Sequence, residues 1–149
     1  MKNFLIVGLG LILILSVGLK AQNPENDPPT TIIKSVYFDG GSYLIDDEQM
    51  EEIRKLVESL PNPEEYQISI TSHTDNIGGK AYNEWLSRMR SDAVLKELMQ
   101  NNISEKNILS KDFGQENPLY DNRSVNGRIM NRRVDIIFLV RCYNISRLR

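Results

Sequence analysis

Residues 71–90, TSHTDNIGGKAYNEWLSRMR, span the end of a strand, a glycine turn and the first half of a helix. The strand is predicted at Tyr66–Ser72, where apolar and polar residues alternate as in a strand with one buried face. The helix is predicted at Lys80–Gln100. Four of its apolar residues recur at steps of four, three and four and define the expected core stripe: Tyr82, Leu86, Met89 and Ala93. Such a unit is typical of a sheet covered by helices.

Further elements are predicted on both sides of this unit. They are a strand at Ile32–Phe38, a helix at Asp46–Ser59, a strand at Asn107–Phe113 and a strand at Arg133–Val140. The intervening segment Gly114–Asn131 is expected to be a polar loop with one helical turn near Arg128. The apolar run of the last strand, RVDIIFLV, predicts burial on both of its faces. The predicted fold class is α/β, an α+β sandwich of helices on one sheet.

The N-terminal segment, residues 1–21, has the layout of a secretory signal peptide. Lys2 gives it a positive start, an uncharged run of 16 residues extends from Phe4 to Leu19, and Ala21 is a small residue suited to cleavage. The alternative is an uncleaved anchor, which would associate with a membrane through residues 4–19, although a spanning helix needs about 20 apolar residues. Either interpretation predicts an exported protein.

The rest of the chain divides into three parts. Residues 22–31, QNPENDPPTT, are polar with three prolines and are predicted to form a semi-rigid linker. Residues 32–141 form the predicted folded domain, and residues 142–149 form a basic C-terminal tail. The tail holds the single cysteine, Cys142, which excludes an internal disulfide framework and is interpreted as structural or incidental.

The composition excludes several classes of function. The chain has 18 basic and 20 acidic residues, net charge -2, so no binding to nucleic acid is expected, because phosphate contacts need clustered Lys and Arg. The single histidine, His73, excludes a multi-histidine metal site, and we expect it to be structural. No cofactor is predicted. A hydrolase would need a nucleophile and base or a metal cluster, and the sequence supports neither.

Polar residues around the glycine turn are the candidates for a binding site. Asp75 follows the strand and precedes the helix, and such strand ends are common ligand positions in α/β sheets. On the helix, Asn83, Ser87 and Arg90 step by four and three, so they share one face that borders the core stripe. Arg90 could hold a carboxylate there. The alternative is an internal ion pair between Asp75 and Arg90.

A second cluster of charge lies near the C-terminal end of the domain. The segment 126–134, NGRIMNRRV, contains Arg128, Arg132 and Arg133, whereas the helix at Asp46–Ser59 is acidic. The arginines either bind an anionic polymer or balance the acidic helix within the molecule.

Six short motifs resemble one known family when they are taken together and in order. They are VYFD at 36–39, HTDNIG at 73–78, AYNEWLSRMR at 81–90, FGQENP at 113–118, DN at 121–122 and GRIMNRRV at 127–134. They resemble the OmpA-like C-terminal domain, also found in peptidoglycan-associated lipoprotein and in MotB. The resemblance implies a βαβαββ order with a mixed four-stranded sheet packed by helices.

The resemblance also implies a ligand and the residues that bind it. Family members bind peptidoglycan non-covalently through diaminopimelate of the stem peptide. By resemblance, Asp75 takes the ammonium group of the ligand and Arg90 takes its carboxylate. The other implied site residues are Asn83 and Leu86 on the helix, Phe38 and Asp39 after the first strand, and Arg132. Ser72 and Gly40-Gly41 depart from the usual family pattern.

We therefore expect an exported, non-enzymatic protein that binds peptidoglycan and tethers or spaces the layers of a Gram-negative envelope. Its expected location is the periplasm, in association with the outer membrane. Envelope proteins are further candidate partners. Two alternatives stay open: a membrane-anchored envelope subunit that binds a protein partner, and a wall-processing hydrolase.

Overall fold

The computed structural model describes residues 31–140. The predicted signal peptide or anchor, linker residues 22–30, Cys142 and the basic tail lie outside the described residues. The described part forms one four-stranded sheet with helices. Its elements in chain order are β1 (Thr31–Tyr37), α1 (Asp47–Ser59), β2 (Tyr66–Ser72), α2 (Lys80–Gln100), β3 (Ile108–Asp112), α3 (Val125–Asn131) and β4 (Arg133–Val140). The predicted fold class and every predicted strand and long helix are confirmed.

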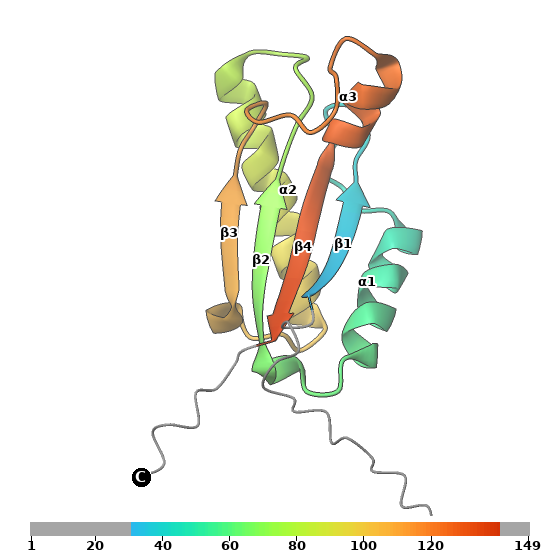
Figure 1. Cartoon of the computed structure of the whole chain (residues 1–149), viewed down its shortest axis with the longest axis vertical. Helices are drawn as coiled ribbons and strands as arrows, with labels where there is room; N and C mark the ends of the chain where they lie inside the picture. Colours follow the sequence, from blue (N-terminus) through green and yellow to red (C-terminus); the bar gives the residue numbers. More distant parts are fainter. Residues whose placement is uncertain (1–30, 141–149) are drawn as a thin grey trace, which may run out of the picture.

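The sheet is mixed, with the strand order β1-β4-β2-β3 (Figure 1). β4 is antiparallel to both of its neighbours, whereas β2 and β3 are parallel and are joined through α2. The register places Val134 of β4 opposite both Val36 and Ser72. The segments after β1, β2 and β3 and the segment before β4 therefore meet at one end of the sheet, the upper end in Figure 1.

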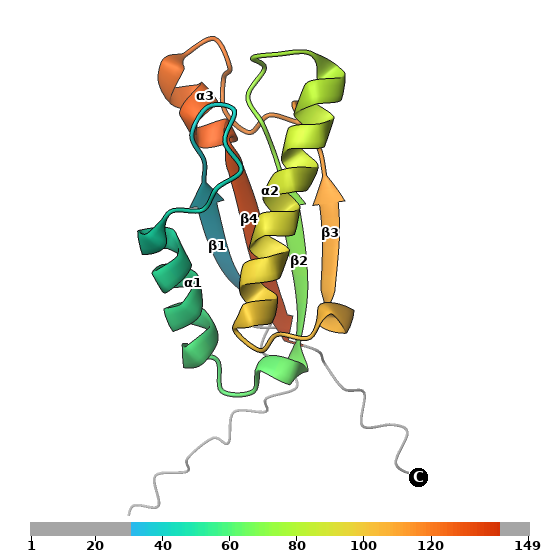
Figure 2. The ribbon, with the colours of Figure 1, turned by 180° about the vertical axis from the view of Figure 1, so that it is seen from behind.

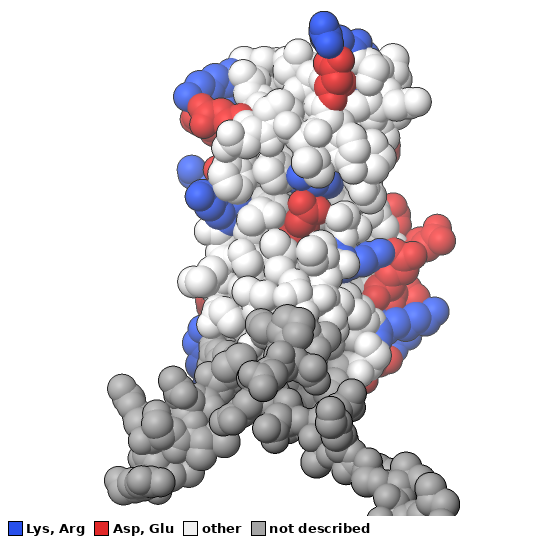
Figure 3. All heavy atoms as spheres, in the orientation of Figure 1, with Lys and Arg blue, Asp and Glu red and all other residues white. Residues whose placement is uncertain are grey.

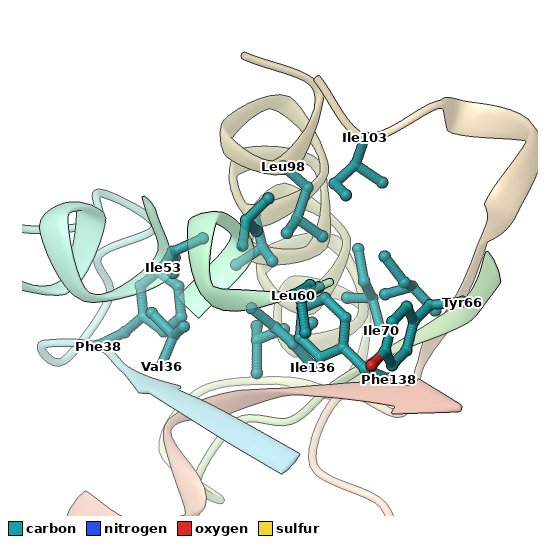
Figure 4. Close-up of a cluster of buried hydrophobic side chains, with 14 residues drawn as sticks. Val36, Phe38, Ile53, Leu60, Tyr66, Ile70, Leu98, Ile103, Ile136 and Phe138 are labelled. Carbon is teal, nitrogen blue, oxygen red and sulfur yellow. The ribbon is translucent and has the colours of Figure 1, made fainter. Parts of the chain in front are cut away.

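The two long helices, α1 and α2, cover one face of the sheet (Figures 1 and 2). The core lies between them and the strands, as the close-up in Figure 4 shows. Its fully buried side chains include Ile53 of α1, Leu98 of α2, Ile70 of β2 and Ile136 of β4. Burial of these apolar side chains between the helices and the sheet is the main source of stability.

Within residues 31–140, no helix is long and apolar enough to cross a membrane.

α1 begins with a side-chain cap that also protects the edge of the sheet. Asp46 precedes the helix and accepts a hydrogen bond from the backbone N–H of Gln49, three residues later, as an N-cap residue does. The Gln49 carboxamide then bonds both backbone groups of Tyr37, accepting from N–H at 2.6 Å and donating to C=O at 2.9 Å. Gln49 therefore occupies the edge of β1 as a neighbouring strand would.

The expected burial of β4 on both faces is wrong. Val134, Ile136 and Phe138 point to the helices and are fully buried, but Leu139 on the opposite face is 37% exposed. The reason is that the helices cover only one face, although β4 is a central strand. Figure 3 views the uncovered face and shows that charged side chains lie mainly along its two sides.

The expected core stripe of α2 is also wrong in part. Leu86 is buried, but Tyr82 is 45% exposed. The buried face of the first half of the helix is instead polar and includes Asn83, Ser87 and Arg90. At this end of the sheet the helix packs on loops rather than on apolar strand residues. There Ser87 Oγ accepts from the N–H of Gly114, so the backbone of the loops supplies partners for polar side chains.

Candidate ligand-binding site

A cavity of about 320 Å³ opens at the end of the sheet where the loops meet. The loop after β1, the turn between β2 and α2, the start of α2 and α3 all contribute to it. The lining residues are Gly40, Gly41, Thr74, Asp75, Ile77, Gly78, Tyr82, Leu86, Arg90, Arg128 and Arg132. The charged residues among them are three arginines and one aspartate. The structure thus brings together four of the predicted site residues: Asp75, Leu86, Arg90 and Arg132.

Asp75 is nearly buried and has a partner for each carboxylate oxygen. Oδ1 accepts from the backbone N–H of Ile77 at 3.0 Å, a local bond that shapes the turn before α2. Oδ2 accepts from Nη1 of Arg132 at 3.1 Å, and the two side chains form a mostly buried ion pair. Arg132 is itself fixed, because its Nε donates to the backbone oxygen of Phe38 at 3.0 Å.

Arg90 is completely buried and ties three segments of backbone to α2. Its Nε donates to the oxygen of Ser42, Nη1 to the oxygen of His73 and Nη2 to the oxygen of Asp39, over 2.9, 3.0 and 3.1 Å. The guanidinium carbon also lies 4.9 Å from the ring centroid of Phe38. A guanidinium has five N–H donors, so two remain for another acceptor.

Burial lowers the pKa of Arg90 to about 10. The Asp75 carboxylate acts in the opposite direction, and the Arg132 guanidinium adds to the lowering. Arg90 is still charged at neutral pH, since this value is far above 7. The cavity therefore presents a positive charge that is desolvated and held in one orientation.

The interpretation of Asp75 and Arg90 as an internal ion pair is wrong. Among residues 31–140, the arginine paired with Asp75 is Arg132, whereas Arg90 is held by backbone carbonyls. The sequence spacing could not reveal this, because Arg132 lies 57 residues after Asp75 and reaches it only through the antiparallel pairing of β4 with β2.

Three other predicted site residues lie beside the cavity and do not line it. Asn83 is buried and its Nδ2 donates to Ile77 O and to Gln115 Oε1, which ties two loops together. Its Oδ1 is buried without a hydrogen-bond partner in the described part of the chain. Phe38 and Asp39 line a separate groove along β1, and they contact the site through their backbone oxygens.

Seven of the lining residues were not predicted to be site residues, and Tyr82 and Arg128 have the largest side chains among them. Tyr82 was assigned to the core by its spacing, but its ring lies against Gly78 in the turn before α2. Arg128 was grouped with other arginines on charge alone. The N–H groups of its Nη1 donate to the backbone oxygens of Asn122 and Arg123, and α3 carries it to the cavity. The sequence feature that could have identified Arg128 is its spacing of four from Arg132, because residues four apart on a helical turn lie on the same side.

His73 is buried beside the site and stacks on Phe113, with ring centroids 5.0 Å apart. Burial lowers the pKa of His73, and the positive charge of Arg133 lowers it further, while Asp135 acts in the opposite direction. In residues 31–140, no group of three or more His, Cys, Asp or Glu side chains is placed to hold a metal ion. The contacts of His73 agree with the expected structural role.

The OmpA family model matches residues 37–132, which contain every loop of the cavity. The chain belongs to the OmpA family. It is 35% identical over 100 residues to outer membrane protein Omp38 of Acinetobacter baumannii, covering 66% of this chain and 28% of Omp38. The chain spans about a third or less of the outer membrane porins that it matches.

Solved structures show the same fold. The peptidoglycan-associated lipoprotein of Burkholderia pseudomallei is 27% identical with a TM-score of 0.65, covering 70% of this chain and 88% of that one. The C-terminal domain of Helicobacter pylori MotB is 25% identical with a TM-score of 0.62, covering 76% and 87%. The relatives are outer membrane proteins and envelope lipoproteins, which confirms the expected location in the periplasm in association with the outer membrane.

Proposed function

We propose that this protein binds peptidoglycan non-covalently through diaminopimelate of the stem peptide and thereby tethers or spaces layers of the envelope. The observation that carries the proposal is the shared cavity of Asp75 and Arg90. Membership of the OmpA family and the likeness to a peptidoglycan-associated lipoprotein support it.

The free end of diaminopimelate carries one ammonium and one carboxylate on the same carbon. Asp75 supplies an acceptor for the ammonium, and the two unused N–H groups of Arg90 supply donors for the carboxylate. Both groups are fixed by the fold before a ligand arrives, which reduces the entropy lost on binding. With three arginines and one aspartate, the cavity favours a ligand whose carboxylates outnumber its ammonium groups.

The remaining predicted residues have supporting roles in this proposal. Leu86 gives the cavity an apolar wall, and Arg132 orients Asp75. Asn83, Phe38 and Asp39 position the loops through the contacts described above. We propose no catalytic role for the cavity, whose charged residues Asp75, Arg90, Arg128 and Arg132 are all engaged in an ion pair or in hydrogen bonds to backbone.

Co-sedimentation of the full chain with purified sacculi tests the proposal. Wild type should pellet, whereas Asp75→Asn and Arg90→Lys should stay largely in the supernatant. The matched controls Asp92→Asn and Arg88→Lys change exposed residues of α2 and should pellet as wild type does. Circular dichroism verifies that each variant is folded.

Competition defines the chemistry of the ligand. The stem tripeptide L-Ala-γ-D-Glu-diaminopimelate should release wild type from sacculi. The same tripeptide with lysine in place of diaminopimelate should not, because the free end of its side chain carries an ammonium without a carboxylate. Wild type that stays in the supernatant with sacculi overturns the proposal. It would instead favour the alternative in which the cavity takes the carboxy-terminus of a protein partner. Release of muropeptides from the sacculi would favour the other alternative, in which the protein is a wall-processing hydrolase.

A further inference from the structure

Three aromatic side chains form an exposed cluster beside the cavity. Tyr43 lies in the loop after β1, and Tyr82 and Trp85 lie at the start of α2. The ring centroids of Tyr43 and Trp85 are 6.0 Å apart at 85°, and those of Tyr82 and Trp85 are 5.7 Å apart at 35°. The three side chains are 36%, 45% and 46% exposed, so the cluster is not part of the core. We call it the aromatic platform.

The Tyr82 ring of the platform lies close to two glycines. A Cβ on Gly78 would lie 3.1 Å from Cδ1 of Tyr82, and a Cβ on Gly41 would lie 3.4 Å from its hydroxyl oxygen. Both glycines have positive φ, +99° and +71°, which side-chain-bearing residues rarely adopt. The Tyr82 ring therefore fits against backbone from two loops, which limits its motion.

The platform is continuous with the cavity, because Tyr82 belongs to both. In Figure 2 the loop after β1 and the first turns of α2 lie at the same upper end of the molecule. Exposed apolar side chains grouped beside a cavity are typical of interaction sites, since isolated ones are normal but clusters are uncommon. A ligand that fills the cavity and continues outward past Tyr82 meets Trp85 and Tyr43 next.

We propose that the aromatic platform is a second binding site, which stacks on a sugar ring of the glycan strand that carries the bound stem peptide. This inference rests on the proposed function. In peptidoglycan the diaminopimelate residue is separated from the sugar by two residues, a reach on the order of 10 Å. The C–H groups on one face of a pyranose ring pack well on uncharged aromatic faces, which matches the three rings of the platform.

The test compares a ligand with and without sugar. Isothermal titration of the full chain uses the stem tripeptide L-Ala-γ-D-Glu-diaminopimelate and the same tripeptide attached to its N-acetylglucosamine–N-acetylmuramic acid disaccharide. Wild type should bind the disaccharide-peptide more tightly. Trp85→Ala should lower the affinity for the disaccharide-peptide roughly three- to tenfold, as expected for the loss of one aromatic contact. Its affinity for the tripeptide should equal that of wild type.

Two controls sharpen the result. Trp85→Phe keeps an aromatic face and should retain most of the added affinity. Tyr37→Ala removes an aromatic side chain of similar exposure that does not line the cavity, and it should bind both ligands as wild type does. Trp85 is half exposed on a helix, so its replacement by alanine is expected to leave the fold intact.

The outcomes separate the two proposals. Equal affinity of wild type for both ligands, or equal loss for both in Trp85→Ala, overturns the sugar site and leaves the proposed function standing. Binding of neither ligand by wild type overturns the proposed function, and the sugar site with it.

Discussion

Arg132 holds Asp75 by a 3.1 Å hydrogen bond from Nη1 to Oδ2, so the acidic group of the cavity is already paired in the free protein. An incoming ammonium group therefore joins an existing ion pair. This explains why the cavity needs more than one arginine, since Arg132 is occupied with Asp75 while Arg90 keeps two free donors.

The first prediction concerns the coupling of this pair. Arg132→Gln and Asp75→Asn should each lower the free energy of unfolding by about 1–3 kcal/mol, because each leaves a mostly buried charged partner. The double variant should lose less than the sum, with a coupling energy of about 1–2 kcal/mol. Urea denaturation of the four proteins gives this value. Additive effects would show that the two groups do not interact.

The second prediction concerns Arg90 and the loops that it ties together. Arg90→Lys should lower the free energy of unfolding by about 1–3 kcal/mol, because one ammonium cannot replace a planar fork that bonds the oxygens of Ser42, His73 and Asp39. The domain should stay folded, since natural domains have about 5–15 kcal/mol of stability. The control Arg88→Lys, on the exposed face of α2, should change the free energy of unfolding by less than about 0.5 kcal/mol. Equal effects of the two variants would contradict the role given to Arg90.

The third prediction concerns pH. Burial lowers the pKa of His73 below its ordinary value near 6.5, so just below that pH the folded state binds fewer protons than the unfolded state. The free energy of unfolding should therefore fall as the pH decreases from 6.5 toward the folded pKa. In His73→Gln this part of the pH dependence should be absent, and carboxylate titration should remain. The comparison is clear because the chain has one histidine.

Nuclear magnetic resonance titration of the imidazole protons of His73 gives an independent check. The midpoint should lie below 6.5. A midpoint at or above this value would mean that the imidazole is not desolvated by its stacking on Phe113.

The fourth prediction concerns α3, which carries Arg128 to the cavity and directly precedes Arg132. A Cβ at Gly127 would lie 2.1 Å from the backbone oxygen of Asp121, so the helix could not keep its position. Gly127→Ala should lower the free energy of unfolding by more than about 2 kcal/mol and reduce sacculus binding. Gly40→Ala adds a Cβ with no atom within 4 Å and should be nearly neutral in stability. Normal stability of Gly127→Ala would show that α3 can shift freely.

Local sequence patterns were sufficient to predict the elements of this fold. The alternation in Tyr66–Ser72 depends on neighbouring residues, and the strand was predicted from it. Arg133–Val140 was predicted as a strand for the same reason, but its two-face burial was not correct, because the number of covered faces depends on where the helices pack.

The arrangement of the site could be predicted only in part. The motifs identified Asp75 and Arg90, and the structure places both at one cavity. The partner of Asp75 and the buried polar face of α2 were not predicted, because both depend on loops far away in the sequence. Tyr82 shows the difficulty most clearly. Its spacing matches a core position, and only the glycine loops that lie beneath its ring reveal that it faces outward.

The antiparallel pairing of β1 with β4 has a mechanical consequence. Thr31 lies opposite Leu139, at the end of the sheet away from the cavity, and Tyr37 lies opposite Arg133 at the cavity end. A pull between a ligand held in the cavity and the chain that enters at Thr31 acts along the length of β1. Its hydrogen bonds with β4 are then loaded in shear, all together, rather than broken one after another. A domain stretched in this direction yields by sliding of whole strands, which requires more force than peeling.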